Sequence, residues 1–324
     1  YNIFFRETDY GEFNVANYLT NSNGFGAQFG YPISDISRLG FNITYDKTDI
    51  DIGTLPAREI YDFVSVEGNI FETLTAQLSW QQVTLNRGLF PTDGASTVVS
   101  FSSTIPGSDL SYYRFNIRQR YYQPLSSDFV FGFQGEIGYL DSYGDTEEIP
   151  FFQNFYAGGP RSLRGFESNT LGPRSTDAPC YEFNYEEGTC PNLIDTDGDG
   201  EADAPYLNPY ANQGQRSRYR DAPIGGNIKV EGSLQLIFRL PFIEDQRSLR
   251  SAFFFDFGNV FSDNCKEYQI NCSELSVDEL RYSYGVGVTW ITGFGPMSLA
   301  IAKPTNAGPL ERTEEFQFTV GNVF

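Results

Sequence analysis

The residues of this sequence that could do chemistry are carboxylates, arginines and four cysteines, because the chain contains no histidine. Without histidine, Ser-His-Asp and Cys-His catalysis and the usual zinc sites are excluded. The carboxylates are scattered over loops, and no nucleophile–base pair or lipase elbow stands out. We therefore predict that the chain is not an enzyme and requires no cofactor.

One acidic run, "DTDGDGEAD" (195–203), has a spacing that suits a calcium ion. Aspartates occupy the first, third, fifth and ninth positions of a calcium loop, and a glycine occupies the sixth. These candidate ligands are Asp195, Asp197, Asp199 and Asp203. The twelfth position of an EF-hand is glutamate, but here it is Tyr206, so the run is not an EF-hand. Two interpretations remain open: a shorter extracellular calcium loop, or an acidic surface loop without metal.

The four cysteines form two close pairs, Cys180 with Cys190 and Cys265 with Cys272. Each pair lies in a loop rich in Asp, Asn and Gly, and no C-x-x-C spacing occurs. Free thiols or metal ligands are the alternative. The spacing favours two local disulfides, which implies an oxidising compartment.

The stretch "NFYAGGPRSLRGFESNTLGPR" (154–174) combines one arginine with glycines that permit close backbone approach. Arg164 precedes Gly165 and Phe166. A guanidinium offers five donors in a fixed fork and cannot be neutralised, so a carboxylate can bind it through two parallel hydrogen bonds. We expect Arg164 to be an anchor of this loop. The alternative is a solvated loop arginine.

The elements that must position these residues are strands, because period-2 alternation of apolar and polar residues dominates the sequence. The segments run to about ten residues or more, the length of a tilted strand that crosses a bilayer. The twelve expected strands lie near 1–8, 24–33, 37–47, 71–85, 95–105, 111–122, 128–140, 227–240, 249–261, 280–292, 295–303 and 314–324.

The connections between these strands alternate in length. Short ones such as "ISD" (33–35) and "TGFGP" (292–296) alternate with long ones such as 48–70 and 141–226. This alternation is typical of a transmembrane β-barrel of the outer membrane. The whole chain is then one barrel domain, with long loops and both cysteine pairs outside and both chain ends periplasmic. The alternative is a soluble protein of two or more β-sandwiches.

One short helix is expected at 56–64 inside a long loop, with Ile60, Phe63 and Val64 on one side. We interpret it as packing rather than function. The chain opens directly in a strand without a visible signal peptide, so we expect an upstream part of the protein.

The composition agrees with this class. The 324 residues include 42 acidic and 22 basic ones, and the net charge of −20 speaks against nucleic-acid binding. No run of eighteen apolar residues occurs, so the sequence predicts no transmembrane helix.

Four stretches, in order along nearly the whole chain, resemble the BamA/TamA outer-membrane insertase superfamily, and the BamA branch more than the TamA branch. They are "RGLFPTDGASTVVSFSSTIPGSD", "FYAGGPRSLRGFESNTLGPR", "FFFDFGNVF" and "EEFQFTVGNVF". The resemblance implies a barrel in the outer membrane of Gram-negative bacteria that folds and inserts other barrel proteins without ATP. It also implies that the loop tip folds back into the barrel lumen.

The same resemblance implies a partner for Arg164. Strand parity places Asp256 on the lumen face, and the loop arginine of the family pairs with an aspartate at this position. Family members carry a second acid on the preceding strand, where this chain has Gln235. Glu231 lies four residues earlier on the same face and is the candidate substitute.

The last strand is the second implied site. In the family the first and last strands pair weakly, and this seam opens sideways. The seam and C-terminal signal residues are Phe316, Phe318, Val320, Gly321 and Phe324. An interior glycine weakens a strand, and an exposed strand edge can template an incoming one. The interpretation as an ordinary barrel strand stays open.

The implied partners are outer-membrane lipids and lipopolysaccharide, unfolded outer-membrane protein clients, and accessory lipoproteins bound through periplasmic POTRA domains that this chain does not contain. Other functions remain open: a TamA-like or two-partner secretion translocation barrel, or a passive channel or adhesin. The family barrel has sixteen strands and the first four have no counterpart here. The chain is therefore truncated, incomplete or a redesigned smaller barrel. If 1–8 closed on 314–324, insertase activity would not be expected.

Overall fold

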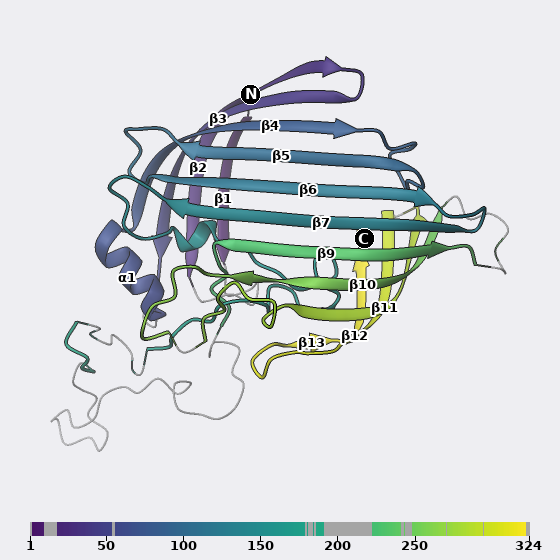
Figure 1. Ribbon diagram of the computed structural model, residues 1–324. Helices are drawn as coiled ribbons and strands as arrows, with labels where there is room; N and C mark the ends of the chain where they lie inside the picture. The colour runs from purple at the N-terminus through teal and green to yellow at the C-terminus, as the bar shows by residue number, and fades with distance from the viewer. Residues whose placement is uncertain are drawn as a thin grey trace.

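One large antiparallel sheet dominates the computed structural model (Figure 1). The structure describes residues 2–9, 18–53, 56–178, 180, 184, 186–190, 222–240, 243, 248–269, 271–293 and 295–321. Within them, twelve strands follow one another in the order β1-β2-β3-β4-β5-β6-β7-β9-β10-β11-β12-β14. The strands are β1 (Asn2–Asp9), β2 (Leu19–Ser34), β3 (Ser37–Asp51), β4 (Ile70–Val83), β5 (Gly94–Thr104), β6 (Tyr112–Pro124), β7 (Phe129–Ser142), β9 (Ile228–Phe238), β10 (Leu249–Phe261), β11 (Arg281–Thr292), β12 (Gly295–Pro304) and β14 (Phe316–Val320).

Each of the twelve strands expected from the sequence corresponds to one strand of this sheet, so the predicted fold class is confirmed. The last one differs in detail. It is divided into β13 (Thr313–Glu314), which belongs to a small second sheet, and β14. Residues 322–324, including Phe324, lie outside the described residues.

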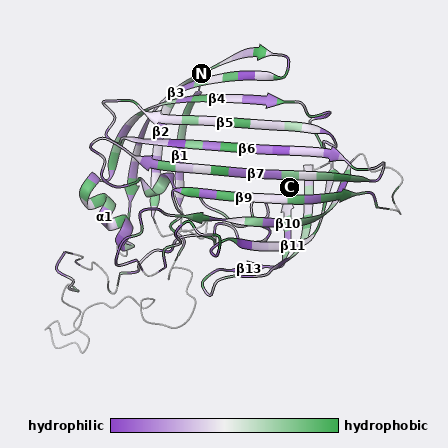
Figure 2. Ribbon diagram, viewed as in Figure 1, coloured by the Kyte–Doolittle hydropathy of each residue, from purple (hydrophilic) through white to green (hydrophobic). Residues whose placement is uncertain are grey.

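Alternation of side chains explains why the sheet has two different faces. On β10, Phe253 and Phe255 are 55% and 40% exposed, whereas Asp256 between Phe255 and Phe257 is 0% exposed. Figure 2 shows the same alternation as short apolar and polar bands along the strands. Because successive side chains point to opposite faces, the outer face is apolar and the inner face carries most of the polar groups.

The two ends of the sheet are β1 and β14. In the described part of the chain, no strand pairing joins them, and each pairs on one side, β1 with β2 and β14 with β12. None of the described helices is long and apolar enough to cross a membrane.

The inner face packs against the loop between β7 and β9 and against helix α1 (Arg58–Glu67), which lies near the end of the sheet that carries the long connections (Figure 1). The helix buries Ile60 and Phe63, as its pattern predicted, and Val64 packs at the edge of the same core. Phe63 meets Phe151 edge to face, with ring centroids 5.2 Å apart. Phe151 begins the short 3-10 helix η2 (Phe151–Gln153) of the loop, so the aromatic cluster joins α1 to the loop.

Candidate functional site

The tip of the β7–β9 loop lies against the inner face of the last strands. There β8 (Gly165–Phe166) pairs with β13 in a two-stranded sheet. Gly165 has a φ of +89°, and a Cβ at this position would lie 3.1 Å from Ala302 Cβ. Glycine therefore lets the backbone take a left-handed conformation and approach β12 closely.

The Arg164 side chain lies on the Asp256 carboxylate. Nε and Nη2 of Arg164 each donate a hydrogen bond of 2.7 Å to a different oxygen of Asp256, and the Arg164 backbone N–H donates a third of 3.1 Å. Both residues are buried, at 5% and 0% exposure. The guanidinium carbon also stacks 3.5 Å from the centroid of the Phe254 ring. A buried bidentate pair with three hydrogen bonds fixes both the position and the orientation of the loop tip.

Strand β9 supplies the next acceptor through a residue that the sequence did not single out. Arg164 Nη2 donates a hydrogen bond of 2.9 Å to Ser233 Oγ. Ser233 lies on the inner face of β9 between the two expected candidates, Glu231 and Gln235. Gln235 donates 3.3 Å to the same Ser233 oxygen. Glu231 accepts a 2.5 Å hydrogen bond from Ser162 and forms an ion pair with Lys229 at 3.1 Å. Glu231 thus binds the loop through Ser162, two residues before Arg164.

The loop tip is also bonded to the last strand. Gln317 of β14 is 1% exposed, and its amide is used in both directions. It donates a hydrogen bond of 2.7 Å to the carbonyl oxygen of Phe166 and accepts one of 3.3 Å from the backbone N–H of Gly165. Gln317 lies between the outward-facing Phe316 and Phe318, and the sequence carried no signal for its contact with the loop tip. One tripeptide therefore contacts β9, β10 and β14.

The turn before Arg164 also depends on glycine. Gly158 and Gly159 have φ values of +103° and +100°. A Cβ on Gly158 would lie 2.6 Å from the carbonyl oxygen of Glu167, so a side chain does not fit there. The Gly158 N–H donates 3.1 Å to Ser162 Oγ, which closes the turn and aims Arg164 at Asp256.

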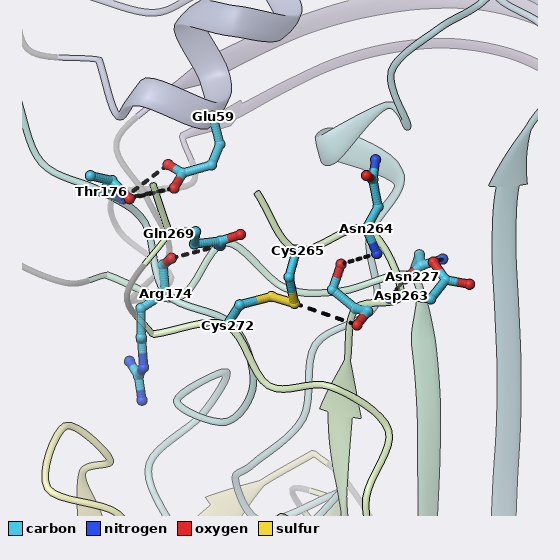
Figure 3. The surroundings of a disulfide bond; sticks show 10 residues. Glu59, Arg174, Thr176, Asn227, Asp263, Asn264, Cys265, Gln269 and Cys272 are labelled. Carbon is cyan, nitrogen blue, oxygen red and sulfur yellow. Dashed lines mark hydrogen bonds between the residues drawn. A yellow bond between two sulfur atoms is a disulfide. The ribbon is translucent and has the colours of Figure 1, made fainter. Parts of the chain in front are cut away.

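Outside the sheet, the same loop is held by α1 and by the connection from β10 to β11 (Figure 3). Glu59 of α1 accepts hydrogen bonds from the backbone N–H and the hydroxyl of Thr176. Burial raises the pKa of Glu59, although the Thr176 hydrogen bonds act in the opposite direction. Gln269 donates 3.0 Å to the carbonyl oxygen of Arg174, and Figure 3 shows it beside the Cys265–Cys272 disulfide.

Both predicted disulfides are present, Cys180–Cys190 and Cys265–Cys272. The second one lies in the connection between β10 and β11. In the same connection, the Tyr268 hydroxyl donates a hydrogen bond of 2.6 Å to Asp62 of α1. Desolvation and the nearby carboxylates raise the pKa of Tyr268, so this hydroxyl stays protonated and donates. The disulfide therefore holds a segment that bonds to both α1 and the long loop.

The remaining predicted residues fall into two groups. Phe316, Phe318 and Val320 face outward, at 59%, 50% and 52% exposure, and Gly321 has a φ of +84°. Phe324 and the calcium candidates Asp195, Asp197, Asp199 and Asp203 lie outside the described residues. In the described ranges, no group of three or more carboxylate or cysteine side chains could hold a metal ion. Calcium binding stays a prediction.

A long-stranded antiparallel sheet with an apolar outer face, and a loop anchored on its inner face, define the class of membrane β-barrels with an inserted loop. The model of the Omp85 superfamily domain matches residues 1–324. The chain belongs to the Omp85 superfamily, and it is an integral β-barrel protein of the outer membrane.

Two of the similar proteins have assembly in their names. The outer membrane protein assembly factor BamA of Neisseria meningitidis is 28% identical over 337 residues, which cover 96% of this chain and 37% of that protein. The mouse sorting and assembly machinery component 50 homolog is 24% identical, over 86% of this chain and 50% of that protein. This chain thus spans half or less of these relatives.

Solved structures agree with the family. BamA from Haemophilus ducreyi lacking POTRA domains 1-3 superposes with a TM-score of 0.77 and 25% identity, over 98% of this chain and 57% of that chain. CdiB from Escherichia coli has a TM-score of 0.51 at 9% identity, which shows a shared fold alone. The chain is thus similar to the barrel portion of BamA.

Proposed function

We propose that this chain is the barrel of an outer-membrane protein assembly machine, which catalyses the folding and insertion of β-barrel proteins without ATP. Two relatives carry assembly in their names, and the BamA barrel has the same fold. The observation that carries the proposal is the attachment of one loop tip to both β10 and β14. This contact joins the inserted loop to an end strand of the sheet, the strand whose movement the proposed mechanism requires.

In this mechanism, incoming client strands pair with the free edges of the sheet, β1 and β14. A strand edge presents unsatisfied backbone N–H and C=O groups, and an incoming strand can pair with them. In a bilayer these groups must be satisfied within protein, so pairing at the edge lowers the cost of entry. Burial of the apolar outer face of the client in lipid supplies the driving force, which is why ATP is not needed.

The short β14 suits this role. In the described part of the chain, its five residues from Phe316 to Val320 pair with β12, and Glu315 and Gly321 on either side each add one backbone hydrogen bond to β12. The next residue, Gly321, has a left-handed backbone, and a Cβ added to it would meet no atom within 4 Å. A strand of this length contributes few ladder hydrogen bonds, so its end can separate at low cost.

The partners follow from the proposed role. Unfolded outer-membrane proteins are the clients, and lipids and lipopolysaccharide surround the apolar face. Accessory lipoproteins would bind through periplasmic domains outside this chain. In the proposed orientation the short connections face the periplasm, whereas the long loops, with both disulfides, face the exterior.

The test is an insertion assay in liposomes. The purified chain is reconstituted, alone and joined to the periplasmic domains of the meningococcal relative, and the folding of a small eight-stranded client is followed by its heat-modifiable mobility. We expect faster client folding than in empty liposomes and no effect of ATP removal. Arg164→Ala should abolish the acceleration.

The matched control is Arg161→Ala, because Arg161 is an exposed arginine three residues earlier in the same loop. It should retain the acceleration. If neither form of the chain accelerates folding although its sheet is intact by circular dichroism, the proposed function is wrong. Equal activity of the Arg164→Ala variant would remove the loop tip from the mechanism.

A further inference from the structure

A cavity of about 730 Å³ lies at the end of the sheet that carries the short connections. Its walls come from three of them, between β4 and β5, β6 and β7, and β9 and β10. In Figure 1 this is the right-hand end, away from α1. The cavity is therefore separate from the Arg164 anchor and from the outer loops.

The charges of this cavity are mostly positive, in a chain whose net charge is −20. Arg87, Arg239 and Arg250 line it, and the acidic residue among its described lining is Asp128. Asp128 is already 4.0 Å from Arg239. Among the described lining residues, the Asp128 carboxylate thus lies near Arg239 and not near Arg87 or Arg250.

Arg250 is the centre of this arrangement. It lies on the inner face of β10, and its guanidinium carbon is 4.8 Å from the centroid of the Tyr122 ring. Its Nη2 atom is buried and has no hydrogen-bond partner among the described residues. A buried guanidinium nitrogen without a hydrogen bond is costly, and an anion that accepts from it would remove this cost.

We propose that this cavity binds a phosphate group, with the half-buried Arg250 as the inner ligand and the exposed Arg87 as the ligand at the rim. A guanidinium donates two parallel hydrogen bonds to a phosphate, and several arginines favour a doubly charged anion. The rest of the lining is mixed: Asn86, Thr92, Ser126 and Ser127 are polar, whereas Phe90, Val130, Ile237 and Leu249 form an apolar part of the wall. Such walls suit a phosphate that carries an apolar chain.

Phe90 supports the view that the site is built. It is 6% exposed although it belongs to a turn, and its φ is +49°. A bulky residue in the left-handed region is strained, so its burial at the cavity wall must offset that strain. The phosphate group could come from a lipid headgroup or from free phosphate, and the experiment distinguishes the two.

The inference does not depend on the proposed insertase function, because its test measures binding by the purified chain. The thermal unfolding of the chain in a non-ionic detergent is followed with inorganic phosphate, with dihexanoyl phosphatidic acid, and with dihexanoyl phosphatidylcholine below its micellar concentration. Chloride keeps the ionic strength constant. Ligands that bind the folded state raise the midpoint in proportion to their affinity and concentration.

We expect phosphatidic acid to raise the midpoint at concentrations at least about tenfold lower than inorganic phosphate, and phosphatidylcholine to have no effect. That result assigns the site to a lipid phosphate monoester. A response to inorganic phosphate at the same concentration also supports the site and assigns it to the free ion. Arg250→Gln should weaken either response at least about tenfold.

Arg87→Gln is the second variant, because Arg87 is exposed in a turn and its replacement should not disturb folding. Arg38→Gln is the matched control, an exposed arginine near another short connection outside the cavity lining. The proposal is overturned if no phosphate compound raises the midpoint, or if both cavity variants respond like the control.

The connection between β9 and β10 also carries Glu244 and Asp245, which lie outside the described residues. The double variant Glu244→Gln, Asp245→Asn tests whether these carboxylates compete with phosphate. A stronger phosphate response in this variant supports the site. A lowered midpoint without any phosphate response would assign these acids as the partners of Arg250 and overturn the proposal.

Discussion

Arg164 and Asp256 lie 92 positions apart in the sequence, and two side-chain hydrogen bonds of 2.7 Å join them on the inner face of the sheet. The pair is buried, so each charge depends on the other for its solvation. Taking one charge away leaves the other in a buried site without its partner, which is more costly than the pair is stabilising. The contact is therefore a strong positional constraint on the loop.

Replacement of Arg164 should release the loop tip while the strands persist. For Arg164→Ala we expect loss of about 3–5 kcal/mol of docking free energy, because Asp256 keeps a buried charge. Arg164→Lys should recover only part of it, since an ammonium lacks the fork and the stacking on Phe254. Hydrogen exchange of residues 156–172 measures the effect, with Arg161→Ala as the control. Unchanged protection in Arg164→Ala would contradict the anchor.

The left-handed backbone of Gly165 should make it intolerant of a side chain. Gly165→Ala places a methyl group 3.1 Å from Ala302 Cβ at a φ of +89°. The strain should cost about 1–3 kcal/mol, seen as a lower midpoint of thermal unfolding and faster exchange at Phe166. Gly88→Ala is the control, because a Cβ added there would meet no atom within 4 Å. Similar midpoints for the two variants would count against a strained tip.

Gln317 should decide how firmly β14 is held. In Gln317→Leu the Phe166 carbonyl and the Gly165 N–H lose their partner while the volume stays similar. We expect a loss of about 1–3 kcal/mol in the docking of β14, because the Phe166 carbonyl is left buried without this hydrogen bond. Hydrogen exchange along 316–320 measures it, and Gln81→Leu at an exposed position of β4 is the control. An unchanged hydrogen-exchange rate along 316–320 in Gln317→Leu would show that pairing with β12 alone holds β14.

The attachment of α1 to the long loop should depend on pH through Glu59. Burial raises its pKa in the folded chain above the ordinary value of 4.5, so the folded state binds the proton more tightly than the unfolded state. The stabilisation is complete below the unfolded pKa and is lost as the pH rises through the folded pKa. Protease resistance of the loop between pH 4 and 8 should thus decrease from about pH 4.5 upward.

Glu59→Gln keeps the shape of the side chain and should remove this pH dependence. Glu147→Gln, at an exposed loop position, should keep it. A Glu59→Gln variant with the same pH profile as the unmodified chain would show that another group titrates.

Reduction of the Cys265–Cys272 disulfide should loosen the outer attachment and leave the inner one in place. A bridge that spans 7 positions restricts a short loop, and its loss should cost about 2–3 kcal/mol. In Cys265→Ser, Cys272→Ser we expect faster exchange near Gln269 and Arg174 and unchanged exchange near Arg164. Cys180→Ser, Cys190→Ser is the control pair. Faster exchange at Arg164 would show that the two attachments are coupled.

The sequence predicted the strands and the inner face well, because a half-buried strand has a two-residue period that any apolar residue can satisfy. Parity alone placed Asp256 on the inner face. The same parity could not choose among Glu231, Ser233 and Gln235, which share one face of β9. Which of the three contacts Arg164 depends on how far along β9 the loop tip reaches. The sequence has no periodic pattern that reports this position.

Gln317 was missed for a related reason. Alternation with Phe316 and Phe318 puts its amide on the inner face, where it has many candidate partners. Only the path of the loop brings Gly165 and Phe166 to it. The outer attachment is a third case. The pattern of α1 predicted its apolar side, Ile60 and Phe63, whereas the Glu59–Thr176 contact joins segments 117 residues apart.

The attachments of the loop tip differ in strength, and this difference sets the order in which they can break. The bond to β10 is a buried ion pair, whereas the bonds to β14 come from one neutral amide. A neutral hydrogen bond contributes about 0.5–1.5 kcal/mol, less than half the cost of breaking a buried ion pair. If β14 separates from the sheet, its hydrogen bonds to the loop tip break first. The loop tip then stays bound to β10 through the Arg164–Asp256 ion pair.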